Sequence, residues 1–174
     1  MTEKAIIKQI GKISEIDFQK PKAIGSAGFY LKSFKSKNSE SENLKLDSKC
    51  NFEKRTNGVL LRSNYSNKLT AIPIPKESII EIKITRGNET IDPFFLSPMW
   101  FLLKLGVSKL YARYFRFRLH EYSIQQMELK FKTTEYDMDF IANGYLFERQ
   151  LSFFESLNYE NKLKIEIQKT LIIK

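Results

Sequence analysis

Residues 127–140 have the sequence MELKFKTTEYDMDF, in which two runs of alternating side chains surround a polar turn. In the first run, Met127, Leu129 and Phe131 alternate with charged residues, and the second run continues the alternation after residues 133–135. A period of two residues indicates a β-strand with one buried and one solvated face. The stretch therefore predicts two adjacent antiparallel strands.

The same alternation appears in other parts of the chain. Residues 79–85 place Ile80, Ile82 and Ile84 on one face, and residues 163–167 alternate in the same way. Weaker strand candidates lie between turn-forming residues, at 27–34, 43–47, 58–65 and 69–74. We expect a mostly antiparallel β-structure in which each strand has one face toward solvent.

Within the basic and aromatic stretch KLYARYFRFRLH, which begins at Lys109, the alternation of residues 115–119 predicts a further strand with a basic face. We expect Arg113, Arg116 and Arg118 to form a solvated row there. The residues expected to face the core are Phe115, Phe117 and Leu119.

Three segments have a helical period instead. Residues 145–157 carry an apolar stripe at spacings of three and four residues, with Asn143 as a candidate N-cap. Near the N-terminus a second stripe suits a helix, although Gly11 weakens it. Its members are Ile6, Ile10, Ile13 and Ile16. Residues 98–105 predict a third, short helix.

That short helix lies in an apolar segment, residues 93–106, with the sequence PFFLSPMWFLLKLG. Pro98 suits the first helical position behind Ser97 as N-cap, and Gly106 suits the end. The segment is too short to span a bilayer, because Lys104 follows about ten apolar residues and a spanning helix needs about 20. Loops between strands are normally polar, so these apolar groups must be buried against something.

A short stretch resembles a known family. Residues 71–82, AIPIPKESIIEI, are similar to a stretch of pleckstrin-homology-like domains, including the bacterial and GRAM-type members. There a strand ends in a proline-containing turn and the next strand begins. The resemblance covers residues 26–157 and places a closing helix at 145–157. It implies a scaffold for binding lipids or peptides, but the segment 93–106 and a strand at 163–173 depart from the pattern.

The 174 residues suit one domain with a sizeable core. The predicted fold class is mostly β (α+β), an antiparallel PH-like β-barrel or bent sandwich. It has a closing amphipathic helix near 145–157 and a short apolar helical insertion near 98–105. Within a single domain, 1–174, the expected parts are an N-terminal arm or helix (1–20), a PH-like core (26–157) and an extra C-terminal strand (161–174).

Cysteine usage and the N-terminal residues bear on the cellular compartment. The single cysteine, Cys50, excludes an intramolecular disulfide framework and a cysteine-based zinc site. Lys4, Lys8 and Lys12 interrupt the apolar residues near the N-terminus, so no secretory signal is evident. We therefore expect a cytoplasmic protein, peripheral to the inner face of the membrane if it binds lipid.

Positive charge is concentrated in the middle of the chain. The formal net charge is +9, from 29 basic and 20 acidic side chains. Residues 93–120 contain no acidic residue and hold five cations, Lys104, Lys109, Arg113, Arg116 and Arg118. A focused positive field of this kind attracts anionic surfaces.

The search for catalytic groups is negative. The chain has no glycine-rich phosphate-binding motif and no nucleophile-elbow motif. His120 is the only histidine and is expected on the surface. Cys50 lies in a polar stretch predicted to be a loop, and a catalytic thiolate usually needs a histidine partner. We therefore predict no catalytic residue and no cofactor, with an enzyme of unrecognised type as an alternative.

One acidic cluster could hold a metal ion. Glu135, Asp137 and Asp139 share one face of a predicted strand. Cross-strand pairs with Lys130 and Lys132 are the favoured interpretation, and such pairs contribute about 0.2–1 kcal/mol each. We therefore predict no metal site.

The apolar segment and the basic row together predict a non-catalytic binding module. The candidate binding residues are Trp100, Phe101, Lys104, Lys109, Arg113, Arg116 and Arg118. Three interpretations of the apolar segment stay open. It is part of the core, a contact with a second subunit or a protein partner, or a tip that enters an anionic membrane interface. Nucleic-acid binding is a disfavoured alternative, because inward-facing aromatic residues cannot stack on bases.

Overall fold

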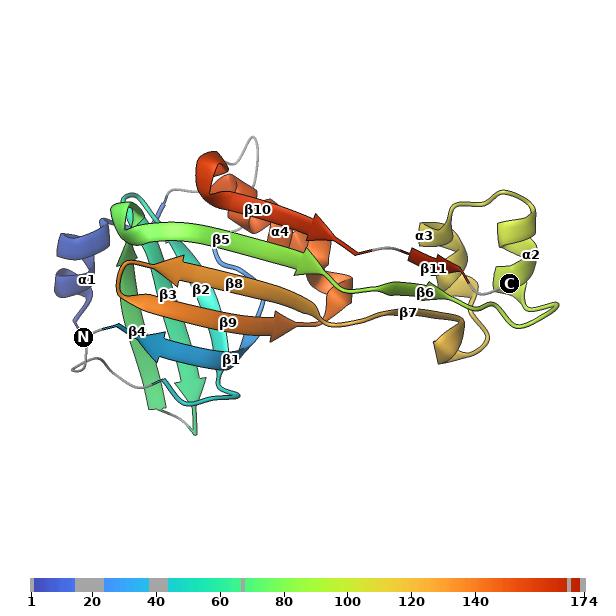
Figure 1. The fold of residues 1–174 in the computed structure, drawn as a ribbon, viewed down its shortest axis with the longest axis horizontal. Helices are drawn as coiled ribbons and strands as arrows, with labels where there is room; N and C mark the ends of the chain where they lie inside the picture. Colours follow the sequence, from blue (N-terminus) through green and yellow to red (C-terminus); the bar gives the residue numbers. More distant parts are fainter. Residues whose placement is uncertain (1, 15–23, 38–43, 67, 169, 173–174) are drawn as a thin grey trace.

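The computed structural model describes residues 2–14, 24–37, 44–66, 68–168 and 170–172. Within them the chain forms an eight-stranded sheet, the main sheet, and a three-stranded sheet that extends from it (Figure 1). The described residues are mostly β with a few helices, so the predicted α+β class is confirmed.

The strands are β1 (Phe29–Ser36), β2 (Lys49–Arg55), β3 (Gly58–Tyr65), β4 (Lys68–Pro75), β5 (Ile79–Arg86), β6 (Glu89–Ile91), β7 (Tyr122–Ile124), β8 (Met127–Thr133), β9 (Tyr136–Ala142), β10 (Leu163–Ile167) and β11 (Thr170–Ile172). The α-helices are α1 (Glu3–Ile10), α2 (Pro98–Lys104), α3 (Lys109–Ala112) and α4 (Phe147–Ser156). The 3-10 turns are η1 (Lys76–Ser78), η2 (Arg113–Phe115), η3 (Leu119–Glu121), η4 (Gly144–Leu146) and η5 (Glu160–Lys162).

The main sheet has the strand order β10-β5-β8-β9-β1-β2-β3-β4. Neighbouring strands run antiparallel except β10 and β5, which run parallel. The strands predicted from residues 127–140 are β8 and β9, with Leu129 opposite Phe140. Among the described residues, β10 and β4 stay at the two edges and do not pair with each other. Of the two predicted forms, the closed barrel is therefore wrong.

The main sheet bends around an aromatic core. The ring of Phe52 in β2 stacks on that of Phe131 in β8, with centroids 5.2 Å apart, although two strands separate β2 from β8. Phe154 of α4 contacts Phe52 at 5.6 Å. Helix α4 therefore covers the core as predicted. Asn143 accepts a hydrogen bond from the backbone N–H of Tyr145, where the preceding turn η4 begins.

The first residues of β5 differ from the prediction. Ile82 and Ile84 are buried as expected, but Ile80 is exposed. The pairing of β5 with β8 shifts register between Ile79 and Glu81. Because a shift of one residue turns side chains to the opposite face, Ile79 enters the core in place of Ile80.

The strand predicted at residues 43–47 is wrong. Residue 43 lies outside the described residues, and residues 44–47 form an irregular segment with a turn, in which Asp47 has a φ of 59°. Strand β2 begins at Lys49. The polar residues there favour the turn over a strand.

The N-terminal helix is confirmed over part of its predicted length. In α1, Ile6 and Ile10 are buried in a small cluster with Leu60 of β3. The helix ends before Gly11, whose φ is 79° and whose added Cβ would overlap the Thr56 side chain. Ile13 is exposed, and Ile16 lies outside the described residues.

Strands β11, β6 and β7 form the three-stranded sheet, which we call the arm. Strand β6 follows β5 and β7 leads into β8, so the arm extends the β5–β8 pair beyond the main sheet (Figure 1). Between β5 and β6, a Cβ at Gly87 would lie 2.5 Å from the carbonyl oxygens of Gln125 and Gln126, so this close approach requires glycine. The arm carries the apolar segment away from the core.

Candidate functional site

The arm ends in a small helical lobe, residues 93–120, which we call the tip (Figure 1). It contains α2, α3 and the turn η2, and η3 begins at its end. A small apolar cluster where tip and arm meet consists of Ile91, Met99, Ala112 and Tyr122. The tip therefore has its own core, separate from that of the main sheet.

Helix α2 forms where the sequence predicts it. The Ser97 hydroxyl accepts a hydrogen bond from the backbone N–H of Trp100 at 3.1 Å, and Pro98 occupies the first turn. Gly106, with a φ of 79°, follows the helix end. Met99 is buried against the arm, whereas Phe101 is exposed. One side of α2 thus packs on the protein and the other side is uncovered.

The buried carboxylate of Glu121 joins the two ends of the tip. It accepts hydrogen bonds from Ser97 Oγ at 2.7 Å and from the backbone N–H groups of Phe117 and Arg118 at 3.0 and 2.8 Å. Burial acts to raise the pKa of Glu121, but these hydrogen bonds outweigh burial and hold the pKa below its ordinary value. The carboxylate is therefore charged at neutral pH and fully partnered.

A second buried carboxylate, Glu89, holds α3 against the arm. It accepts a hydrogen bond from the Tyr122 hydroxyl at 2.5 Å and forms an ion pair with Lys109. Burial, together with the hydrogen bond to Glu89, raises the pKa of Tyr122 to about 12. The phenol therefore stays protonated and donates to Glu89 throughout the physiological range.

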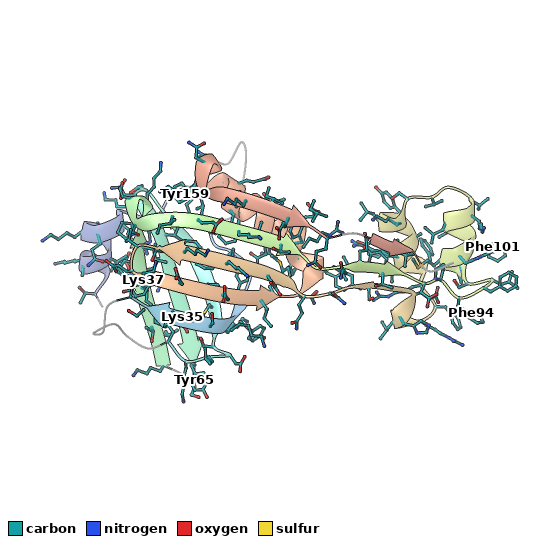
Figure 2. The ribbon with its side chains drawn as sticks, viewed as in Figure 1. Lys35, Lys37, Tyr65, Phe94, Phe101 and Tyr159 are labelled. Carbon is teal, nitrogen blue, oxygen red and sulfur yellow. The ribbon has the colours of Figure 1, made fainter. Side chains whose placement is uncertain are left out.

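Large apolar side chains are exposed over much of the tip. Of the 21 exposed large apolar residues in the described part of the chain, 11 lie in these 28 positions, so they are not evenly scattered. They are Phe94, Phe95, Leu96, Phe101, Leu105, Leu110, Tyr111, Tyr114, Phe115, Phe117 and Leu119. Concentrations of this kind mark interaction surfaces on folded proteins. In Figure 2, Phe94 and Phe101 lie at one end of the molecule, and Tyr65 of the main sheet lies far from them.

Two cations lie beside the aromatic residues of α2 and the loop before it. Lys104 Nζ lies 5.7 Å from the ring centroid of Trp100, and the guanidinium of Arg118 lies 4.6 Å from that of Phe94. Trp100 is half-buried, with its ring 5.1 Å from that of Phe101. These contacts place positive charge directly beside exposed aromatic surface.

The other three predicted cations contact the protein itself. Lys109 pairs with Glu89, and Arg113 lies over the ring of Tyr122 at 5.8 Å. Arg116 donates a hydrogen bond to the carbonyl oxygen of Tyr122 at 3.2 Å. Arg113 and Arg116 therefore do not join Arg118 in the solvated row predicted from the sequence.

The strand predicted at residues 115–119 is wrong. Its residues form parts of η2 and η3 and the irregular segment between them, and Phe115, Phe117 and Leu119 are all exposed. The hydrogen bonds from residues 117 and 118 to Glu121 hold this segment in place of a strand ladder. Phe115 and Phe117 are therefore available for stacking on nucleic-acid bases, contrary to the prediction.

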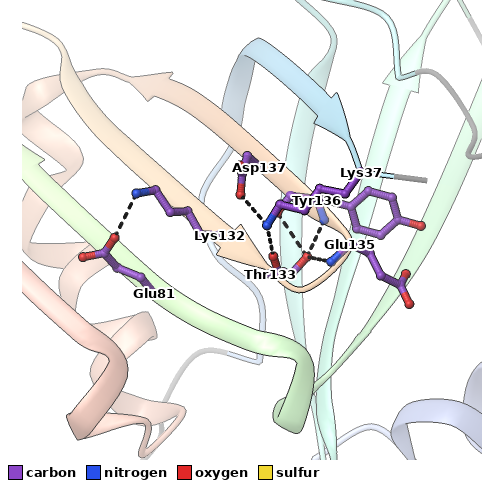
Figure 3. A network of polar contacts seen from close by, with 7 residues as sticks. All are labelled: Lys37, Glu81, Lys132, Thr133, Glu135, Tyr136 and Asp137. Carbon is purple, nitrogen blue, oxygen red and sulfur yellow. Dashed lines mark hydrogen bonds and ion pairs between the residues drawn. The ribbon is translucent and has the colours of Figure 1, made fainter. Parts of the chain in front are cut away.

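The acidic residues of β9 have partners other than those predicted (Figure 3). Lys132 lies opposite Asp137 in the sheet as expected. However, the Lys132 ammonium pairs with Glu81 at 3.3 Å, and Asp137 pairs with Lys37 at 3.2 Å. Asp139 accepts a hydrogen bond from Ser33 at 2.6 Å. Across the described ranges, no three histidine, cysteine or carboxylate side chains are placed to share a metal ion.

The two remaining candidate catalytic residues, Cys50 and His120, lie in different parts of the molecule. Cys50 is fully buried within β2, so its prediction as a loop residue is wrong. Burial raises the pKa of the Cys50 thiol, although hydrogen bonds with Ser48 and Ser63 oppose this. His120 is exposed, as expected.

Sequence reasoning missed the two carboxylates that organise the tip. Glu89 lies in a short polar stretch, RGNETI, that resembles an ordinary turn, and Glu121 follows the basic segment without any distinguishing motif. It also missed the exposed Tyr111, Tyr114 and Leu110. A usable signal was present, because residues 107–120 contain no glycine, proline, asparagine or aspartate to mark an ordinary loop.

No protein-family model matches the chain, and comparisons with curated proteins and with solved structures find no significant match. Within the part of the chain that the structure covers, every helix is too short or too polar to cross a membrane.

Proposed function

We propose that the chain is a non-catalytic binding module that docks on another macromolecular surface through the tip. The observation that carries this proposal is the concentration of exposed apolar side chains at the end of an arm. The arm holds these side chains away from the main sheet. They are therefore not buried in its core. Their burial on a partner would be favourable, at about 1.5–3 kcal/mol for each fully buried Phe or Leu.

The internal hydrogen bonds and ion pair of the tip support the same proposal. The hydrogen bonds of Glu121 and the ion pair of Glu89 order the tip before any contact is made. Preordering lowers the entropy cost of binding. An unfolded segment would also expose its apolar residues, but it would not contain two buried carboxylates with hydrogen-bond and ion-pair partners.

The main sheet is part of the proposal as a PH-like scaffold. Strands β1 to β4 form one meander, β5, β8 and β9 form another, and α4 then covers the core. This order supports the expected outline, in which strands are followed by one closing helix. The tip is an insertion between two strands of the second meander, so the binding surface would be an addition to the scaffold. A cytoplasmic location, peripheral to a membrane or to a larger assembly, belongs to this proposal.

Fractionation of cells that express the full chain tests the proposal. We expect wild-type protein in the particulate fraction and the double variant Phe117→Ser, Leu119→Ser in the supernatant. The matched control is Leu69→Ser, because Leu69 of β4 and Phe117 have the same exposed fraction, 76%. The control should fractionate like the wild type.

Four other outcomes are informative. Wild-type protein in the supernatant, or equal behaviour of the tip variant and the control, would contradict the proposal. Release of the wild type by nuclease would favour the nucleic-acid alternative, which the exposed Phe115 and Phe117 make available. Release by detergent would identify a lipid surface.

A further inference from the structure

We infer that the surface contacted by the tip is an anionic phospholipid bilayer, which Phe94, Phe95 and Phe101 enter from the end of the arm. The inference rests on the proposed function and names its partner. The shape of the tip, the placement of its charges and the kind of apolar residue that it exposes all support a lipid partner.

The shape of the tip suits a flat, soft surface. Phe94, Phe95 and Leu96 lie in the loop before α2, and Phe101 and Leu105 lie on and just after it. Figure 2 shows Phe94 and Phe101 at the extremity of the molecule, and Figure 1 shows the main sheet at the other end of the arm. A projecting end of this kind can enter a bilayer interface while the main sheet stays clear of the lipid headgroups.

The charges of the tip complement anionic headgroups. Lys104 and Arg118 lie against the rings of Trp100 and Phe94, so that cations accompany the residues that would enter the interface. Two carboxylates at the base of the tip, Glu89 and Glu121, are buried and partnered within the protein, and a third, Asp92, is half-buried just before the tip begins. The tip surface therefore offers positive charge with no acidic residue between positions 93 and 120.

The apolar residues favour lipid over the other two classes of partner. Four exposed leucines, Leu96, Leu105, Leu110 and Leu119, cannot stack on nucleic-acid bases. Protein interfaces concentrate apolar residues in a patch with a mixed polar rim and few lysines. Here two cations, Lys104 and Arg118, lie directly beside the aromatic residues of a projecting end, an arrangement that suits interfacial membrane contact.

Binding of the purified full chain to vesicles tests the inference, with Trp100 as an intrinsic probe because it is the only tryptophan. We expect co-sedimentation with vesicles of phosphatidylcholine and phosphatidylserine, and a shift of Trp100 emission to shorter wavelength. Vesicles of phosphatidylcholine alone should bind the chain at least tenfold more weakly, because the cations then have no anionic partner.

Variants locate the contact. Phe94→Ser and Phe101→Ser should each weaken binding to the mixed vesicles about tenfold. Lys104→Gln and Arg118→Gln should each weaken it about fivefold. The controls Leu69→Ser and Lys35→Gln, both on the main sheet, should bind like the wild type. Circular dichroism and the thermal midpoint verify that each variant is folded.

The outcomes separate the inference from the proposed function. If wild-type protein binds neither kind of vesicle but remains in the particulate fraction of cells through the tip, the inference is overturned and a protein partner takes the place of the bilayer. If the main-sheet controls lose vesicle binding while the tip variants keep it, the inference is also overturned. If the wild-type protein shows neither vesicle binding nor retention in the particulate fraction, both the inference and the proposed function fail.

Discussion

The Glu121 carboxylate accepts a hydrogen bond from Ser97 Oγ at 2.7 Å, although the two residues are 24 positions apart in the chain. Ser97 also caps α2, and Glu121 also holds the backbone of the segment before it. Glu121 therefore joins the start of α2 to the segment 117–118 at the other end of the tip. This connection explains how a lobe with so few buried side chains presents its exposed ones in a defined arrangement.

Replacement of Glu121 by Leu should loosen the tip without unfolding the main sheet. The change leaves the Ser97 hydroxyl and two backbone N–H groups without their acceptor, at a cost of about 1–3 kcal/mol for an unsatisfied group. Amide hydrogen exchange at residues 117 and 118 should become about tenfold faster than in the wild type. Amides of β8 serve as the internal reference, and equal acceleration there would contradict a local role for Glu121.

Acid should loosen the tip through the same group. The folded-state pKa of Glu121 is held below its ordinary value, so its contribution to stability is complete above that value. The contribution is lost as the pH falls through the lowered folded-state pKa. Protection at residues 117 and 118, measured against the intrinsic exchange rate at each pH, should therefore decrease as the pH falls from the ordinary pKa of a glutamate through the lowered one. Glu121→Gln should remove this pH dependence, and a variant that keeps it would show that another group titrates.

Phenylalanine residues of the tip and of the core should differ in their effect on stability. Phe101→Ser should change the free energy of unfolding by no more than about 0.5 kcal/mol, because Phe101 is an exposed side chain. Phe52→Ala should cost about 3–5 kcal/mol, because its ring contacts Phe131 and Phe154 in the core. Denaturant unfolding measures both values. A large loss for Phe101→Ser would place α2 in a core and remove the docking surface.

The thiol of Cys50 should be unreactive in the folded protein. It is fully buried in β2, and burial raises its pKa, so little thiolate is present and reagents cannot reach it. A thiol reagent should modify Cys50 only in denaturant, at the rate of an ordinary cysteine. Rapid modification under native conditions would reopen the possibility of a catalytic thiol.

The sequence predicts the parts of this fold that depend on local pattern. Alternation along residues 127–140 predicts β8 and β9, and the stripe of residues 145–157 predicts α4, because each pattern has one buried face. Capping chemistry at Ser97 and Pro98 predicts α2. In these segments the buried face has a partner in the core, so local and tertiary preferences agree.

The features that were not predictable depend on distant residues. The register shift that exposes Ile80 is set by pairing with β8, and the parallel partner of β5 comes from the C-terminal β10. Phe115 and Phe117 have the alternation of a strand, but hydrogen bonds from their segment to Glu121 hold it in turns. Alternation alone does not distinguish a strand that packs on the core from a projecting segment whose aromatic residues are exposed to solvent.

The exchange footprint of the full chain on anionic vesicles tests the central claim most directly. Hydrogen exchange followed by mass spectrometry should show protection by vesicles at residues 93–120 and none at β2 to β4, which lie at the other end of the molecule (Figure 1). Protection confined to the main sheet, with an unchanged tip, would contradict the claim that the tip is the docking surface.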